Sequence, residues 1–147
     1  MNPESVTVPD RDAVRAAEQI YHAWDAALGR KDLEGALSLY AEDAVLESPL
    51  VCHLLGGEEG VIRDRAKLRD FVAMVFARTP PLRQRHRTGF FTDGHRLIWE
   101  YPRVTTAGQQ LDLVEVMEIE GGLIRRHCVY WGWLGVKLLE QDGYRPA

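Results

Sequence analysis

The chain has 147 residues, 46% hydrophobic and 27% charged, a composition typical of one globular domain with a sizeable buried core. Its formal net charge of −4 argues against general binding to nucleic acid or to an anionic membrane surface. No apolar run approaches the roughly 20 residues of a membrane-spanning helix. The two cysteines lie far apart in apolar contexts, which favours free thiols over a disulfide.

The first nine residues carry two prolines and lack the basic-then-apolar pattern of a secretion signal. This start predicts a flexible lead-in over residues 1–9 and a cytoplasmic protein. Residues 10–147 show no internal repeat and no low-complexity segment, so we expect them to form a single domain.

A helix is predicted from Asp10 or Asp12, either of which can cap it, to about Leu28. Apolar residues recur along this segment with the spacing of one helix face. Tyr21 and Trp24 lie on that face, and we expect both rings to be buried beside an internal pocket. Ordinary aromatic core packing is the simpler interpretation of each ring taken alone.

A short helix and a short strand are predicted next. Asp32 caps the helix, whose inward face ends at Tyr40, and the strand covers residues 44–48. A glycine-rich irregular stretch follows over residues 50–61 and contains His53. This histidine could line the mouth of a pocket, although an ordinary packing or surface histidine is the simpler interpretation.

The third helix is predicted from Asp64 to about Arg78, before a Thr-Pro-Pro run that no helix can continue. A strand over residues 82–92 comes next. It places three arginines on one face and His86 on the other, so His86 is a candidate pocket residue.

An Asp-Gly pair at 93–94 is a strong hairpin signal and leads into a strand that carries Trp99 and Glu100. An Ala-Gly pair at 107–108 marks the following turn. If that turn has two residues, Glu100 lies opposite Glu115 and two carboxyl groups come together. A one-residue slip of the register removes this pairing.

The last hairpin is predicted over residues 111–133, with its turn at Gly121 and Gly122. Alternation along its first strand places Glu115 on a face whose other members are all apolar: Leu113, Met117 and Ile119. A carboxylate on such a face must be paired, protonated or active in chemistry.

His127 lies on the second strand of this hairpin. If the turn is accompanied by one bulge residue, Glu115 and His127 become cross-strand neighbours and a usable acid–base pair. The alternative is that Glu115 forms a structural ion pair with Arg125 or Arg126.

Helices placed before a run of antiparallel strands indicate the α+β class. We expect a curved antiparallel sheet wrapped over three helices, which makes a cone with an internal apolar pocket.

Two segments of the chain read GRKDLEGALSLYAEDAVLESP at 29–49 and VEVMEIEGGLIRRHCVYWGW at 114–133. They resemble the nuclear transport factor 2-like superfamily, and most closely its SnoaL-like branch. The resemblance covers about residues 14–139. Relatives include ketosteroid isomerase, limonene epoxide hydrolase, polyketide cyclases, scytalone dehydratase and members without catalysis, so it implies the fold more strongly than a reaction.

Carried over residue by residue, the resemblance places the isomerase's general base at Ser48 and its helical tyrosine at Trp24. The isomerase's protonated aspartate falls near Glu115, and the epoxide hydrolase's last-strand aspartate falls at Val129. Glu115 is thus the one acidic position that the comparison retains, and neither mechanism is implied intact.

The function predicted from these features is cofactor-independent acid–base chemistry on a small hydrophobic carbonyl, polyketide-like or epoxide substrate. The candidate catalytic residues are Glu115, His127 and Glu100. The candidate pocket residues are Tyr21, Trp24, His53, His86, Trp99, Met117, Val129 and Trp131. No metal or cofactor motif is apparent.

Two other functions stay open. The same pocket would suit a non-catalytic ligand-binding or accessory protein, and the fold would suit a purely dimeric scaffold. We expect a homodimer in either case, because Val114 and Val116 would make the outer face of the sheet apolar.

Overall fold

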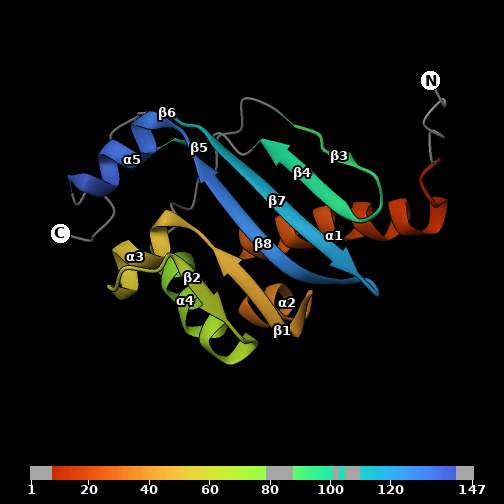
Figure 1. Cartoon of the computed structure of the whole chain (residues 1–147), viewed down its shortest axis with the longest axis horizontal. Helices are drawn as coiled ribbons and strands as arrows, with labels where there is room; N and C mark the ends of the chain where they lie inside the picture. The colour runs from red at the N-terminus through yellow and green to blue at the C-terminus, as the bar shows by residue number, and fades with distance from the viewer. Residues whose placement is uncertain (1–7, 79–87, 101–102, 105–109, 142–147) are drawn as a thin grey trace, which may run out of the picture.

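A six-stranded sheet with helices packed on one of its faces forms the fold (Figure 1). The computed structural model describes residues 8–78, 88–100, 103–104 and 110–141. The helices are α1 (Arg11–Arg30), α2 (Leu33–Leu37), α3 (Pro49–Leu55), α4 (Arg65–Arg78) and α5 (Trp133–Glu140). The strands are β1 (Tyr40–Glu47), β2 (Val61–Arg63), β3 (Phe91–Thr92), β4 (Arg96–Glu100), β5 (Arg103–Val104), β6 (Gln110–Leu111), β7 (Leu113–Glu120) and β8 (Leu123–Trp131).

The strand order in the sheet is β2-β1-β8-β7-β4-β3, and β5 pairs with β6 in a separate two-stranded unit. The predicted α+β class is confirmed. The sheet differs from the fully antiparallel one expected, because β1 and β8 pair in parallel. Most of the chain lies between these two strands, so they are joined by a long crossover and not by a hairpin, as parallel pairing requires.

Side-chain capping sets the starts of the first helices. Asp10 accepts a hydrogen bond from the backbone N–H of Asp12 (3.1 Å), and Asp32 accepts one from Gly35 (2.9 Å). The second helix ends at Leu37, earlier than predicted.

Strand β1 begins at Tyr40, so this tyrosine belongs to the sheet and not to a helix face. Residues expected to be irregular form α3, in which Ser48 is the N-cap and Pro49 occupies the first turn.

The hairpin of β7 and β8 turns at Gly121 and Gly122, whose φ angles of 59° and 75° are accessible to glycine at little cost. Near the turn, Ile119 pairs with Ile124, but Glu118 pairs with Arg126. Arg125 is therefore the extra residue of a bulge.

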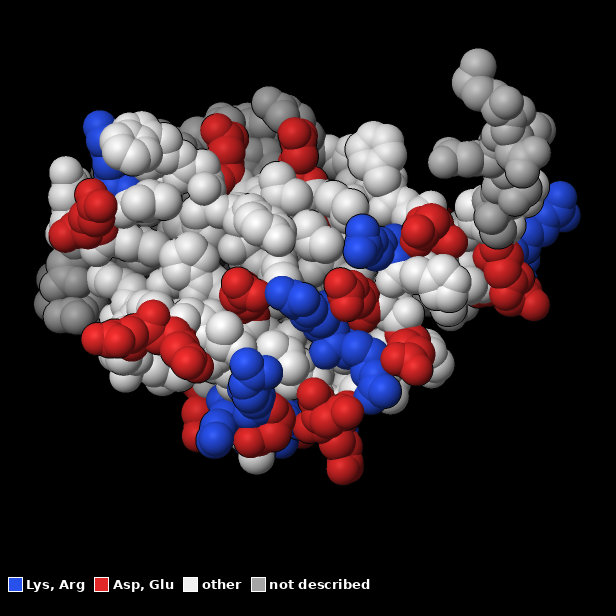
Figure 2. Space-filling view, in the orientation of Figure 1, with Lys and Arg blue, Asp and Glu red and all other residues white. Residues whose placement is uncertain are grey.

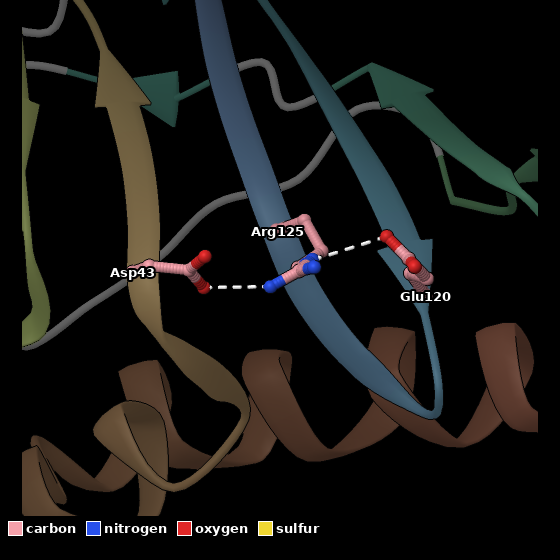
Figure 3. A network of polar contacts seen from close by, with 3 residues as sticks. All are labelled: Asp43, Glu120 and Arg125. Carbon is pink, nitrogen blue, oxygen red and sulfur yellow. Dashed lines mark hydrogen bonds and ion pairs between the residues drawn. The ribbon is translucent and has the colours of Figure 1, made fainter.

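The Arg125 side chain lies on the outer surface of β8, between acidic side chains of the two neighbouring strands, as Figure 3 shows. Its guanidinium contacts Asp43 on β1 at 2.7 Å and Glu120 on β7 at 3.1 Å. The bulge residue thus joins the two neighbours of β8 in an exposed ion-pair network.

Helices α1 and α4 cover the inner face of the sheet, and α1 crosses behind β7 and β8 in Figure 1. The rings of Tyr21 and Trp24 are buried, as expected, and the other buried core residues include Leu68, Phe71, Trp99 and Met117. No helix in the described part of the chain is long and apolar enough to cross a membrane.

Candidate functional site

A cavity of about 70 Å³ lies between the helices and the inner face of the sheet. It is lined by Trp24, Leu28, Leu46, Ser48, Leu50, Phe71, Val72, Val75, Phe76, Leu113, Glu115, His127, Val129 and Trp131. One water needs roughly 10–15 Å³ on the same scale, so the cavity holds only a few waters or a small ligand. Its wall is mainly aliphatic and aromatic, and its ionisable members are Glu115 and His127.

Glu115 and His127 are in direct contact, through the carboxylate Oε2 and the imidazole Nε2. The bulge at Arg125 is what allows this. It lets both Ile124 and His127 point inward, and His127 then sits diagonally across from Glu115, which pairs with Val129.

Tyr40 completes a line of three buried polar side chains. Its hydroxyl lies 2.7 Å from His127 Nδ1, on the side of the ring away from Glu115. Tyr40 is 1% exposed, His127 2% and Glu115 8%. Burial raises the pKa of the Tyr40 phenol well above its usual value, and the charge of Glu115 acts in the same direction. Tyr40 is therefore a neutral phenol at physiological pH.

Hydrogen-bond accounting assigns the tautomer of His127. Within the described residues, Nδ1 is the hydrogen-bond partner of the Tyr40 hydroxyl, so the buried phenol must donate its proton there. Nδ1 is then an acceptor, and the neutral ring carries its proton on Nε2. His127 donates that proton to the Glu115 carboxylate, which keeps further lone pairs available to a molecule in the cavity.

Aromatic rings fix the His127 imidazole from two sides. Trp24 meets it edge-on with ring centroids 5.7 Å apart, and Tyr40 is stacked at 6.0 Å. The imidazole thus has little freedom to leave Glu115.

The predicted site residues divide into three groups. Those that line the cavity are Trp24, Glu115, His127, Val129 and Trp131. Tyr21, Trp99 and Met117 are buried but pack in the core outside the cavity lining, and the Tyr21 and Trp99 rings meet edge-on at 5.4 Å. His53 lies on α3 outside the lining, and His86 lies outside the described residues.

The predicted pairing of Glu100 with Glu115 is wrong. Trp99 lies opposite Glu115, while Glu100 lies opposite Val114 and is exposed. The pairing of β4 with β7 is shifted by one residue from the register that a two-residue turn would give. The pairing of Arg103 with Leu111 shows the same shift. A slip of one residue moves a side chain to the other face of the sheet, so Glu100 is not part of the cavity.

The alternative ion pairs for Glu115 are also wrong. Arg126 contacts Glu47 at 2.9 Å, and Arg125 contacts Asp43 and Glu120. Both guanidinium groups lie on exposed surface, whereas Glu115 is buried on the inner face.

The sequence analysis did not propose Tyr40, which contacts His127, or Ser48, which lines the cavity, as candidate site residues. Tyr40 was missed because a helical pattern was extended over it, which hid the start of β1. Ser48 was noted only as a position where a relative has an acid. The strand alternation of Leu46 and Ser48 was the signal that could have placed it on the inner face.

No group of three or more His, Cys, Asp or Glu side chains in the described ranges is arranged to hold a metal ion.

Comparison with known proteins places the chain in a family. A SnoaL-like protein from Burkholderia thailandensis is 17% identical, with a TM-score of 0.66 over 80% of this chain and 96% of that one. A nuclear transport factor 2-like protein from Burkholderia pseudomallei is 20% identical, with a TM-score of 0.67 over 84% and 96%.

A Kribbella flavida protein named "putative ketosteroid isomerase" is 20% identical, with a TM-score of 0.60 over 80% of this chain and 78% of that one. These likenesses concern the fold. No curated protein matches the chain. The family model of the SnoaL-like domain matches residues 17–127. The chain therefore belongs to the SnoaL-like domain family.

Proposed function

We propose that this protein is a cofactor-independent acid–base enzyme that moves a proton on a carbon next to a carbonyl group. The observation that carries the proposal is the buried Glu115 carboxylate, held by His127 at the wall of an apolar cavity. The SnoaL-like family includes isomerases and cyclases, and one structural neighbour bears an isomerase's name, which supports the same class of reaction.

Glu115 is the base in this proposal. Its carboxylate takes the proton from the carbon, and the electron pair of the broken C–H bond moves to the carbonyl oxygen to give an enolate. Glu115 then returns the proton to a second carbon of the conjugated system, so that the double bond migrates and no atom is gained or lost. A cyclisation or dehydration that begins with the same step would use the same pair.

His127 is a positioning residue and not the base. Its Nδ1 is occupied by the Tyr40 hydroxyl, and its Nε2 carries the proton that faces Glu115. The imidazole thus orients the carboxylate and balances part of its charge without competing for the substrate proton.

The substrate is expected to be small, uncharged and mainly apolar. The cavity wall is dominated by Trp, Phe, Leu and Val side chains, which would leave a charged group on the ligand without a partner. The volume of about 70 Å³ is well below the roughly 300–1,000 Å³ of pockets for drug-sized ligands. A ligand larger than one small ring would require the cavity side chains to move.

The test is the conversion of the β,γ-isomer of cyclohexenone to the conjugated enone, followed by ultraviolet absorbance. Glu115→Gln keeps the size of the side chain and removes the base, so the rate should fall by roughly 100-fold or more. Glu118→Gln is the matched control, because Glu118 lies on the same strand but on the opposite face. Its rate should equal that of the wild type.

A rate that survives in Glu115→Gln would contradict the proposal. So would a wild-type protein that binds cyclohexenone without accelerating its isomerisation or its deuterium exchange in D2O. That second result would favour the other candidate, a non-catalytic binding protein in which the Glu115–His127 contact is only structural.

A further inference from the structure

We propose that Ser48 binds the carbonyl oxygen of the substrate, donating its hydroxyl proton to that oxygen while Glu115 acts on the neighbouring carbon. This inference rests on the proposed function. It assigns the hydrogen-bond donor that stabilises the negative charge on the carbonyl oxygen as the proton leaves the neighbouring carbon.

Ser48 is buried and lines the cavity. It follows the last residue of β1 and is 4% exposed. Its backbone is fixed on both sides, since its N–H donates to the Gly60 carbonyl at 2.9 Å and its own carbonyl accepts from Val51 at 3.0 Å. The side chain therefore starts from a rigid position.

The Ser48 hydroxyl has a proton to donate. Its Oγ accepts a hydrogen bond from the backbone N–H of Leu50 at 3.2 Å, the N-cap contact of α3. A hydroxyl can also donate one bond, and no acceptor for that proton is found among the described residues. Buried hydroxyls normally use their proton, so a ligand oxygen in the cavity would satisfy this group.

The strand register aligns Ser48 with Glu115 across the cavity. In the parallel pair of β1 and β8, Leu46 lies beside His127 and Glu47 beside Cys128, so the next residue, Ser48, comes beside Val129. Val129 in turn pairs with Glu115 on β7. Ser48 and Glu115 are thus two strands apart on the inner face, which is about 10 Å between backbones. Val129, which lies between them, also lines the cavity.

The other polar groups near the cavity are less suited to this role. Tyr40 donates its proton to His127, and His127 donates its proton to Glu115, so both protons are already used. The side chains of Trp24 and Trp131 also line the cavity, and each carries an indole N–H. They are the competing donors, and the experiment must separate them from Ser48.

The experiment compares binding of cyclohexenone with binding of cyclohexene, a ring of similar size without the oxygen. NMR titration of the whole protein gives both dissociation constants. Ser48→Ala should weaken cyclohexenone binding about five-fold, the loss expected for one hydrogen bond, and leave cyclohexene binding unchanged. Glu115→Gln should keep the binding of cyclohexenone and lose only its turnover.

Two controls separate the hydroxyl from the helix cap. Ser48→Thr keeps both the hydroxyl and the cap, so it should retain the preference for the ketone. Asp32→Ala removes the cap of α2, away from the cavity, and should lower thermal stability without altering either dissociation constant.

Infrared spectroscopy tests the wild type directly, whatever the folding of the variants. The carbonyl stretch of bound cyclohexenone should lie at a lower frequency than in an apolar solvent, and should return toward that value in Ser48→Ala. An unshifted stretch in the wild type would overturn the proposal, as would an equal loss of both ligands in Ser48→Ala. A loss that follows Trp24→Phe or Trp131→Phe, with Ser48→Ala unchanged, would assign the donor to that indole instead.

These outcomes are distinct from a failure of the proposed function. If Ser48→Ala behaves as expected but Glu115→Gln retains full turnover, the assignment of Ser48 to the ketone oxygen stands and the assignment of Glu115 as the base is wrong. If Glu115→Gln loses turnover but Ser48→Ala binds both ligands normally, the base stands and the oxygen site is wrong.

Discussion

Tyr40, His127 and Glu115 come from three adjacent strands, β1, β8 and β7, and form one line of hydrogen bonds. Each member limits the next. The neutral phenol leaves Nδ1 of the imidazole only an acceptor role, and the imidazole then offers its proton to the carboxylate. The hydrogen bond that the Glu115 carboxylate receives thus depends on a tyrosine that does not itself line the cavity.

Tyr40→Phe removes the hydroxyl and leaves His127 Nδ1 buried without its donor. We expect a loss of about 1–3 kcal/mol in the free energy of unfolding at pH 7. The loss should shrink above pH 10. There the wild-type unfolded chain ionises its tyrosine at the usual pKa of about 10, while the native state must keep Tyr40 neutral because burial raises its pKa.

The sign of this effect is fixed by the direction of the shift. A raised pKa in the native state means that native Tyr40 binds its proton more tightly, so wild-type stability falls as pH rises past the unfolded value, by about 1.4 kcal/mol per pH unit. Urea unfolding of both proteins between pH 7 and 11 measures the difference in their free energies of unfolding. A difference independent of pH would show that Tyr40 is not held neutral.

At the scale of elements, strand identity was easier to predict from the sequence than register. Alternation alone placed Glu115 with the inward apolar residues of β7, because side chains of a strand point to opposite faces. The pairing of β4 with β7 depends on the length of the connection between them, which alternation does not specify. That is why Glu100 was assigned to the wrong face.

The bulge at Arg125 shows the same limit. Ile124 and His127 are three residues apart, an odd spacing that would place them on opposite faces of a regular strand. The sequence allowed a bulge there but did not require one. Burial favours the bulge, because it allows both residues to be almost fully buried on the inner face.

The turn itself gives an element-scale prediction. Gly122→Ala places a Cβ at a φ of 75°, and the variant should lose about 1–2 kcal/mol of unfolding free energy. Gly122→Asn should lose less, because asparagine tolerates the left-handed region. Nothing described lies within 4 Å of a Cβ at this position, so the cost is one of backbone conformation. Urea denaturation measures both variants, and an equal loss in the two would contradict this account.

At the scale of the whole molecule, the described helices α1 and α4 cover one side of the sheet. They pack on the inner face, and no described segment lies over the middle of β7 and β8 on the side that Figure 1 presents. Figure 2 shows the same side, where an uncharged area lies beside a cluster of acidic and basic groups. Phe91 and Tyr130 on this outer face are 81% and 60% exposed, and Ile98, Val114 and Val116 are only partly buried.

We expect this outer face to form a homodimer. An exposed apolar sheet face is costly in water, and a second copy of the same face can cover it through a two-fold axis. Light scattering at micromolar protein should then give twice the 16.7 kDa mass of one chain. Val116→Arg, in the middle of the face, should give the mass of a single chain because it buries unpaired charge in the contact.

Leu55→Arg is the matched control, since Leu55 is an exposed apolar residue on α3, outside the outer face. It should leave the mass of the dimer unchanged. The substitution at Val116 should not disturb the cavity, because Glu115 and His127 point to the opposite side of the sheet. The monomeric Val116→Arg protein should therefore keep the isomerisation rate of the wild type. A wild-type protein that scatters as a single chain would contradict the dimer, and it would leave the chemistry of the cavity untouched.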